Sequence, residues 1–279
     1  MSNYLGLIDH ASAAESEISQ IQASACGITS LLNVLITLKL ITYNQVTDIN
    51  WEGCIVRKRA NDQPLDSYLA SRSIAGCTGQ ELCSSMEHLI KQNNLQSFNL
   101  QCSFISYQEI VELGITPTTF IERSLKEGHC LVATMNLQLI GNDAWHHQMI
   151  YGMDLTPEEE TGDDGNETHS DDSLSPPLKA EPTTNIYMLN PVSSYPSTML
   201  SSFISTPGVL IVKAEDIIKR HSLPFKNPSF FDLGEWKKMR VREQIGGVVD
   251  MRDDIGNDRK YVVIPANYVG GFAVFKVKP

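Results

Sequence analysis

The sequence lacks any long apolar run and any apolar leader at its amino terminus. Its first twenty residues, MSNYLGLIDHASAAESEISQ, contain no basic segment followed by an apolar one. No stretch approaches the roughly 20 consecutive apolar residues that a membrane-spanning helix needs. We therefore expect a cytoplasmic protein without a membrane partner.

The sequence also has too little positive charge to favour nucleic acid. Its 22 Lys and Arg residues are outnumbered by 33 Asp and Glu residues, and the formal net charge is -11. Such an excess of negative charge repels phosphate backbones and anionic lipid surfaces before any contact is made. We expect no nucleic-acid partner.

Spacings typical of metal ligands are missing as well. The sequence has no CxxC or HxxxH pair, and the adjacent residues His146 and His147 would point to opposite sides of a strand. Six cysteines in a chain without a secretory leader are expected to be reduced thiols. We therefore expect no metal and no cofactor.

What the sequence does contain is enough for one globular domain over residues 1–279. Of these 279 residues, 42% are hydrophobic, which allows a full core. Residues 155–184, by contrast, are rich in Asp, Glu, Ser, Thr, Gly and Pro and cannot bury enough surface to offset chain entropy. They lie between two strand-like segments, WHHQMIYGMDL and NIYMLNP, so we interpret them as a disordered acidic loop inserted between two strands.

Apolar periodicity predicts helices early in the chain and strands late. We expect helices at 26–40, 79–93, 107–127 and 214–220. Ser24 precedes the first helix and is expected to cap it. We expect strands at 130–140, in the two segments beside the acidic loop, and in GGVVDM, KYVVIPA and GGFAVFKV. This order is typical of an α+β domain in which a buried helix packs against an antiparallel sheet.

One segment, QIQASACGITSLLNVL at residues 20–35, carries the main functional signal. Cys26 stands where the first helix begins, and the free N–H groups and dipole of a helix start favour the nucleophilic thiolate. The Cys26 N–H can face an oxyanion, and Gly27 leaves room for a substrate backbone. Gln20 can supply a second oxyanion donor, with Gln22 as the less favoured candidate.

This arrangement resembles papain-like cysteine peptidases, which place a Gln six residues before a catalytic Cys that opens a long central helix. That family also has a His at the start of a core strand, often with a Gly six residues on, and here Gly152 follows His146 at that distance. An orienting Asn or Asp follows a later strand. The resemblance implies a papain-like α+β architecture and four roles: nucleophile Cys26, base His146, orienting residue Asn190 and oxyanion donor Gln20.

A closer likeness is to the basic immunoglobulin-like variable motif-containing protein family, whose members carry a similar SCGISSL-type segment. It continues through IAGCTGQELCSSMEHLIKQNNL, HHQMIYGMD and AEDIIKRHSLPFKNPSFFDLGEW. In that family the third catalytic position need not be Asn. A fainter likeness to actin maturation proteases lies in the CG helix start, WHHQMIYG and KYVVIPANYVGGFAVF. It implies amino-terminal processing of a cytosolic protein.

Cys, His and Asn in this order predict a cysteine peptidase, a thiol hydrolase that acts on a protein or peptide through an acyl-enzyme. A cysteine at a helix start is by itself more often structural, so the prediction depends on the residues together. His147 is the alternative base. Two other functions stay open: a noncatalytic pseudoenzyme or binding module on the same fold, and an acyl transferase in which an amine replaces water.

Overall fold

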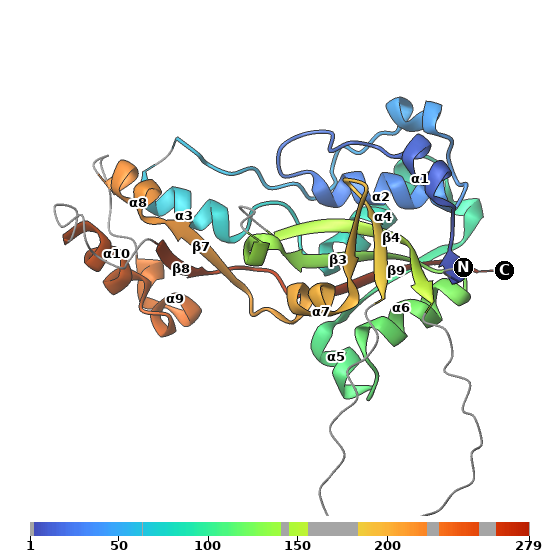
Figure 1. The fold of residues 1–279 in the computed structure, drawn as a ribbon. Coiled ribbons are helices and arrows are strands. Elements are labelled where there is room, and N and C mark those ends of the chain that lie inside the picture. The colour runs from blue at the N-terminus through green and yellow to red at the C-terminus, as the bar shows by residue number, and fades with distance from the viewer. Residues whose placement is uncertain are drawn as a thin grey trace, which may run out of the picture.

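The computed structural model describes residues 3–62, 64–140, 145–155, 184–221, 229–250 and 261–278. In these ranges a seven-stranded sheet lies between two layers of helices, and a two-stranded sheet with its own helices stands at one end (Figure 1). All strand pairs named below are antiparallel, so the expected α+β class with an antiparallel sheet is confirmed. Of the predicted acidic loop, residues 156–183 lie outside the described residues.

The large sheet has the strand order β2-β9-β3-β4-β5-β6, and β1 pairs with the end of β4. Its strands are β1 (Asn3–Gly6), β2 (Leu100–Ser106), β3 (Cys130–Asn136), β4 (Trp145–Leu155), β5 (Asn185–Leu189), β6 (Ser193–Pro196) and β9 (Gly271–Val277). The central strand β3 is buried along its whole length. Its side chains alternate between two cores, because both faces of the sheet are covered.

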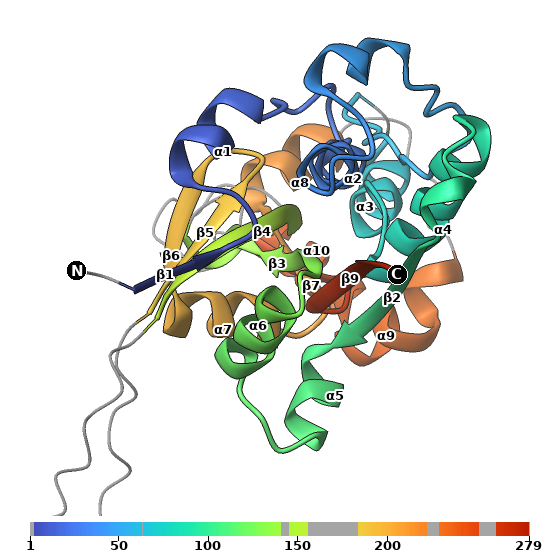
Figure 2. The ribbon, with the colours of Figure 1, turned by 90° about the vertical axis from the view of Figure 1, so that its right-hand side faces the viewer.

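Helices cover the two faces, as Figures 1 and 2 show from different sides. One layer contains α1 (His10–Ser16), α2 (Cys26–Thr37) and α4 (Gly79–Gln92), and the other contains α5 (Tyr107–Glu112), α6 (Pro117–Lys126) and α7 (Ser197–Ser205). Eleven of the twelve residues of α2 are buried, which makes it the central helix of its layer. Short 3-10 helices occur at Tyr43–Asp48, Gln96–Phe98, Leu137–Ile140 and Ser229–Asp232.

A second packing unit surrounds the small sheet. It consists of β7 (Val209–Lys213), β8 (Tyr261–Pro265), α3 (Leu65–Ser73), α8 (Ala214–His221), α9 (Gly234–Lys238) and α10 (Val241–Asp250). Its hydrophobic cluster also includes Trp145, the first residue of β4, and Tyr268. The second unit therefore meets the large sheet at the start of β4. The single domain over residues 1–279 stays a prediction.

Several predicted elements appear with altered ends. The first helix ends at Thr37 and not at residue 40, and the strand expected at 130–140 ends at Asn136. The single helix expected at 107–127 is two helices, because Gly114 adopts a left-handed conformation (φ 71°) and Thr116 caps a new helix that starts with Pro117.

Two local expectations are wrong. Ser24 does not cap α2: its backbone is left-handed (φ 63°), and the residue at the cap position is Ala25, without a side-chain cap. Residues 246–250 of the GGVVDM segment, which was expected as a strand, belong to α10, where Val241, Ile245 and Val248 are buried at helical spacing; residue 251 lies outside the described residues. Among the helices of the described ranges, none combines the length and apolarity that crossing a membrane requires.

Candidate active site

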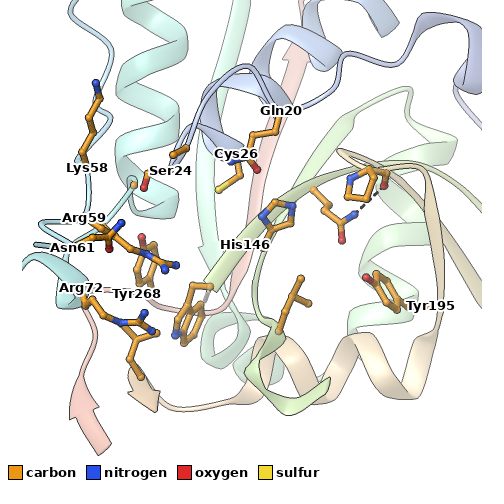
Figure 3. A pocket seen from close by; sticks show the side chains of 18 residues that line it. Gln20, Ser24, Cys26, Lys58, Arg59, Asn61, Arg72, His146, Tyr195 and Tyr268 are labelled. Carbon is orange, nitrogen blue, oxygen red and sulfur yellow. Dashed lines mark hydrogen bonds between the residues drawn. The ribbon is translucent and has the colours of Figure 1, made fainter. Parts of the chain in front are cut away.

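Cys26 and His146 lie together at the point where α2 begins and β4 passes. Cys26 is the first residue of α2 and is 8% exposed, and its side chain lies next to the His146 ring in the wall of a cavity (Figure 3). The pair joins residues far apart in sequence, because α2 packs directly on β4. The predicted nucleophile and base are thus brought into contact.

The electrostatics of this pair favour movement of the thiol proton to the imidazole. Burial raises the pKa of the Cys26 thiol. The hydrogen bond and positive charge of His146 lower it by more than burial raises it, and the backbone N–H groups of His147 and Gly27 add to this effect. The pKa of Cys26 is therefore below its usual value of 9.0. Burial lowers the pKa of His146, and contact with the Cys26 sulfur and the Asn190 backbone raises it above 6.5 overall. A thiolate beside an imidazolium is the form that both shifts favour.

The second ring nitrogen of His146 is held by the main chain. His146 Nε2 lies 2.7 Å from the backbone oxygen of Asn190, so it donates its N–H there and leaves Nδ1 for the sulfur. Asn190 directly follows β5 and was expected to orient the imidazole. The structure places it at that position, but the accepting atom is its backbone carbonyl and not its side chain.

The Asn190 side chain has a different task, which is to join three elements. Its Nδ2 has two hydrogens, which are shared among three acceptors: Cys26 O at 2.9 Å, His147 O at 3.1 Å and Ser30 Oγ at 3.2 Å. Ser30 Oγ donates in turn to His147 O at 3.0 Å. Asn190 is 2% exposed and has a φ of 74°, a left-handed conformation that asparagine adopts more readily than most residues. This network fixes the start of α2 against β4 and the end of β5.

Gln20 reaches the same cavity from the segment that precedes α2. That segment is attached to the helix, because the Ile18 backbone N–H donates to Asn33 Oδ1 at 3.0 Å and the Ile21 N–H donates to Thr29 Oγ1 at 3.2 Å. Gln20 Nε2 donates one hydrogen to the Gln22 backbone oxygen at 2.9 Å. The Gln20 side chain lies beside Cys26 in the cavity wall (Figure 3). The second hydrogen of its amide is the one that could be donated to an oxyanion.

His147, the alternative base, lies on the other side of β4 with both ring nitrogens engaged. Nε2 is 2.8 Å from the Cys77 backbone oxygen and Nδ1 is 3.2 Å from Thr134 Oγ1. Burial, with a smaller contribution from the nearby His146 charge, lowers the pKa of His147 to about 4. Both ring nitrogens of His147 are thus engaged with partners other than Cys26, and a ring kept neutral by burial is less suited than His146 to hold the Cys26 proton.

Gly27 also has a packing role that was not expected. A Cβ at this position would meet Cys77 Sγ at 2.4 Å and Leu82 Cδ2 at 2.8 Å. Glycine is therefore required here because α2 packs closely on α4 and the segment before it, while the approach of a substrate backbone stays a prediction. Burial raises the pKa of the Cys77 thiol well above its usual value, so Cys77 is an inert packing residue.

The cavity beside Cys26 has a volume of about 660 Å³ and lies between the two packing units. Trp145 and Tyr268 form part of its wall, with nearly parallel rings whose centroids are 5.4 Å apart. The Trp145 indole donates to Val209 O at 2.9 Å, which attaches β4 to β7. Lys58, Arg59 and Arg72 were not anticipated as lining residues. For Lys58 and Arg59 a signal was visible in the sequence, the run Arg57-Lys58-Arg59 in an acidic chain, whereas nothing in the sequence singled out Arg72.

Within the described ranges no cluster of three or more His, Cys, Asp and Glu side chains could hold a metal ion. Comparisons of the chain with protein-family models, with curated proteins and with solved structures found no match. The function is therefore inferred from the geometry and chemistry of the site itself.

Proposed function

We propose that the protein is a cysteine-type hydrolase, a peptidase with a papain-like arrangement that acts on a protein or peptide in the cytoplasm. The observation that carries this proposal is the contact between Cys26 and His146, in which the pKa of the thiol is lowered and that of the imidazole is raised. A structural cysteine buried to this extent has its pKa raised, as Cys130 does. Support for a reducing compartment comes from the six cysteines, all of which are free thiols.

In the proposed reaction the Cys26 thiolate attacks the scissile carbonyl carbon, and its oxygen becomes an oxyanion. The Gln20 amide and the Cys26 backbone N–H are the donors assigned to that oxyanion, each worth about 3 kcal/mol in comparable sites. His146 then gives its proton to the leaving amine, the C–N bond breaks and an acyl-enzyme remains. Water attacks the thioester and loses a proton to His146, which releases the acid and restores the thiol.

The Asn190 carbonyl acts as a positioning group in this scheme. It accepts from His146 Nε2 throughout and stabilises the imidazolium by its dipole. Because the carbonyl is part of the main chain, no side-chain substitution at this position removes it directly. The resemblance to papain-like peptidases and the order Cys, His, Asn add independent support from the sequence.

The decisive experiment measures alkylation of individual thiols by iodoacetamide near neutral pH, with peptide mapping by mass spectrometry. We expect Cys26 to react at least about tenfold faster than Cys54, whose pKa burial raises to about 11. Cys83 is the matched control, since a hydrogen bond with Cys102, and not one with a histidine, is the main cause that lowers its pKa. Cys83→Ser should leave the fast phase intact, and Cys26→Ser should abolish it.

Turnover is tested by comparing new peptide termini in cell extracts treated with the wild type and with the Cys26→Ser variant. Termini that appear only with the wild type identify the substrate and separate hydrolysis from acyl transfer, since transfer leaves an amine adduct on the acyl product. Uniform slow alkylation of all six thiols, with no new termini, would favour a noncatalytic binding module.

A further inference from the structure

The turn that follows β5 carries the carbonyl that orients the candidate base. His146 Nε2 donates to the backbone oxygen of Asn190 at 2.7 Å. A backbone carbonyl has no rotamers of its own, so its direction depends on the groups that hold the turn in place. Whatever holds this turn therefore also determines how the His146 ring faces the Cys26 sulfur.

On one side the turn is held by a carboxylate from the amino-terminal part of the chain. Glu17 Oε1 accepts a hydrogen bond from the Asn190 backbone N–H at 3.2 Å, across 173 residues of sequence. A bond from a backbone N–H to a carboxylate is charge-assisted and is stronger than a bond between two neutral groups. This bond and those of the Asn190 side chain fix the residue whose carbonyl faces His146.

On the other side the turn is held by Gln148, the second residue after His146 on β4. Its Nε2 donates to Pro191 O at 3.0 Å and to Ser193 Oγ at 3.0 Å. Gln148 is buried, and side chains two residues apart on a strand project from the same face. The strand that carries His146 thus also holds the turn that orients it, whereas Glu17 holds this turn from a different part of the chain.

The backbone of Glu17 is attached to α2 through the residue that follows it. Glu17 is the cap residue at the end of α1, and the next residue, Ile18, is buried. Asn33 Oδ1 accepts from the Ile18 N–H at 3.0 Å, and Asn33 Nδ2 donates to Thr29 O at 3.0 Å. The Glu17 carboxylate is therefore presented to the turn from a fixed position on the central helix.

The same short segment also carries Gln20. Gln20 lines the cavity beside Cys26 (Figure 3), whereas Glu17 contacts the turn that orients His146. Residues 17–20 consequently reach both parts of the candidate site, the nucleophile through Gln20 and the base through Glu17.

The hydrogen bond of Glu17, and not its charge, is what reaches the imidazole. The pKa of His146 is set by burial, by the Cys26 sulfur and by the Asn190 backbone. The charge of Glu17 acts instead on Tyr151, whose pKa is raised by burial and then by this carboxylate. Glu17 therefore influences His146 through the Asn190 backbone.

We propose that Glu17 is a positioning residue for the base: it holds the Asn190 N–H, so that the Asn190 carbonyl keeps His146 in contact with Cys26. The proposal rests on the proposed hydrolase function and adds a residue to that same site. In this role the carboxylate accepts one hydrogen bond throughout the reaction and neither gains nor loses a proton. A neutral acceptor of the same length can therefore replace it, whereas an apolar side chain cannot.

The first test compares Glu17→Ala with Glu17→Gln by the pH dependence of iodoacetamide alkylation at Cys26. Glu17→Ala removes the acceptor, and the thiol loses part of the contact that lowers its pKa. We expect its alkylation midpoint to rise by about 0.5–1 pH unit and its rate below the midpoint to fall about three- to tenfold. Glu17→Gln keeps an oxygen acceptor at the same distance from the backbone and should restore most of the wild-type profile.

Two further variants serve as controls for this comparison. Glu15→Ala removes an exposed carboxylate from α1 and should leave the pH profile of Cys26 alkylation unchanged. Glu17→Ser has a side chain too short to reach the Asn190 N–H, so it should behave like Glu17→Ala, and it replaces that variant if the alanine substitution prevents folding. Urea unfolding shows that each variant is folded under the conditions of the alkylation assay.

The second test separates positioning of the base from a general loosening of the site. In the His146→Gln background there is no imidazole to position, so adding Glu17→Ala should change the alkylation rate of Cys26 by less than about twofold. A general loosening would instead slow alkylation by the same factor whether or not His146 is present.

The outcomes separate this proposal from the one on which it depends. If wild-type Cys26 reacts rapidly and Glu17→Ala keeps the wild-type pH profile, the positioning role is wrong and the hydrolase stands. The role is also wrong if Glu17→Gln is as impaired as Glu17→Ala, or if Glu17→Ala has the same effect with and without His146. If wild-type Cys26 is no more reactive than the other five thiols, the hydrolase itself is wrong.

Discussion

Replacing Asn190 distinguishes a side-chain role in catalysis from the structural role that its contacts indicate. Asn190→Gly removes the Nδ2 group that donates to Cys26 O, His147 O and Ser30 Oγ, and glycine tolerates the φ of 74° without strain. His147 O keeps the Ser30 hydroxyl as a donor. Leaving the remaining acceptors without this donor in a site that is 2% exposed should cost about 2–3 kcal/mol of unfolding free energy.

Asn190→Asp should be more harmful than Asn190→Gly, although it is closer to the wild type in shape. A carboxylate has no donor at neutral pH and would face the oxygens of Cys26 and His147, so we expect a loss of about 3–5 kcal/mol. In both variants the backbone carbonyl still accepts from His146 Nε2, so the folded fraction should keep the fast alkylation of Cys26.

The measurements are urea unfolding followed by tryptophan fluorescence, and the pH dependence of Cys26 alkylation well below the unfolding temperature. The expected pattern is large changes in the unfolding midpoint with an unchanged pH midpoint for alkylation. Two results would refute the backbone assignment and make the side chain the orienting group. One is an Asn190→Asp variant as stable as the wild type. The other is an Asn190→Gly variant that stays stable while its alkylation midpoint moves up toward pH 9.

Three further predictions concern the neighbours of this residue. His146→Gln should raise the pKa of Cys26, because burial remains without its charged partner, and slow iodoacetamide alkylation at pH 7 by more than about tenfold; an unchanged rate would contradict the contact. Burial lowers the pKa of His147 from 6.5 to about 4, so between these pH values the unfolded chain binds a proton that the folded chain does not. The free energy of unfolding should therefore decrease as the pH falls from 6.5 to 4, by about 3 kcal/mol in total. Urea titrations between pH 7 and pH 4 should show this slope in the wild type and a weaker one in His147→Gln. Gly27→Ala should lower the melting temperature because its Cβ overlaps Cys77 Sγ, and Cys77→Ala should restore part of the loss in the double variant; additive losses would mean that this overlap is not the cause.

The sequence predicted the elements that carry strong periodic signals. The buried helix at Cys26 and the amphipathic helix α4 were visible from apolar spacing, and β4, β5, β8 and β9 from β-favouring residues bounded by turn residues. The GGVVDM segment was misassigned because its β-branched residues favour a strand locally, whereas burial of Val241, Ile245 and Val248 in the second unit determines a helix. Tertiary packing, which a single sequence does not reveal, decided that case.

The sequence predicted which residues form the candidate site, but not which of their atoms make the hydrogen bonds. Strand alternation indicated that one of the two adjacent histidines would face the thiol, and the separation of their ring partners agrees with that geometry. The backbone role of Asn190 could not be inferred, because which atom of a residue accepts a hydrogen bond depends on the left-handed turn after β5. The run Arg57-Lys58-Arg59 was visible in the sequence, but only the structure shows that Lys58 and Arg59 line the cavity and that Arg57 pairs with Glu81.

The Asn190 amide and the Cys26 carbonyl that accepts from it are 164 residues apart in the sequence. This separation determines when, during synthesis of the chain, the pKa of the Cys26 thiol is lowered. While the ribosome is still making the first half of the polypeptide, the sulfur of Cys26 has neither its imidazole nor the carbonyl that orients it, and it behaves as an ordinary thiol. The lowered pKa of this thiol requires His146, and the His146 ring requires the Asn190 carbonyl, so the segment through the turn beyond β5 must be made and docked first. A nascent chain that has not yet reached residue 146 therefore contains Cys26 without the imidazole that lowers its pKa.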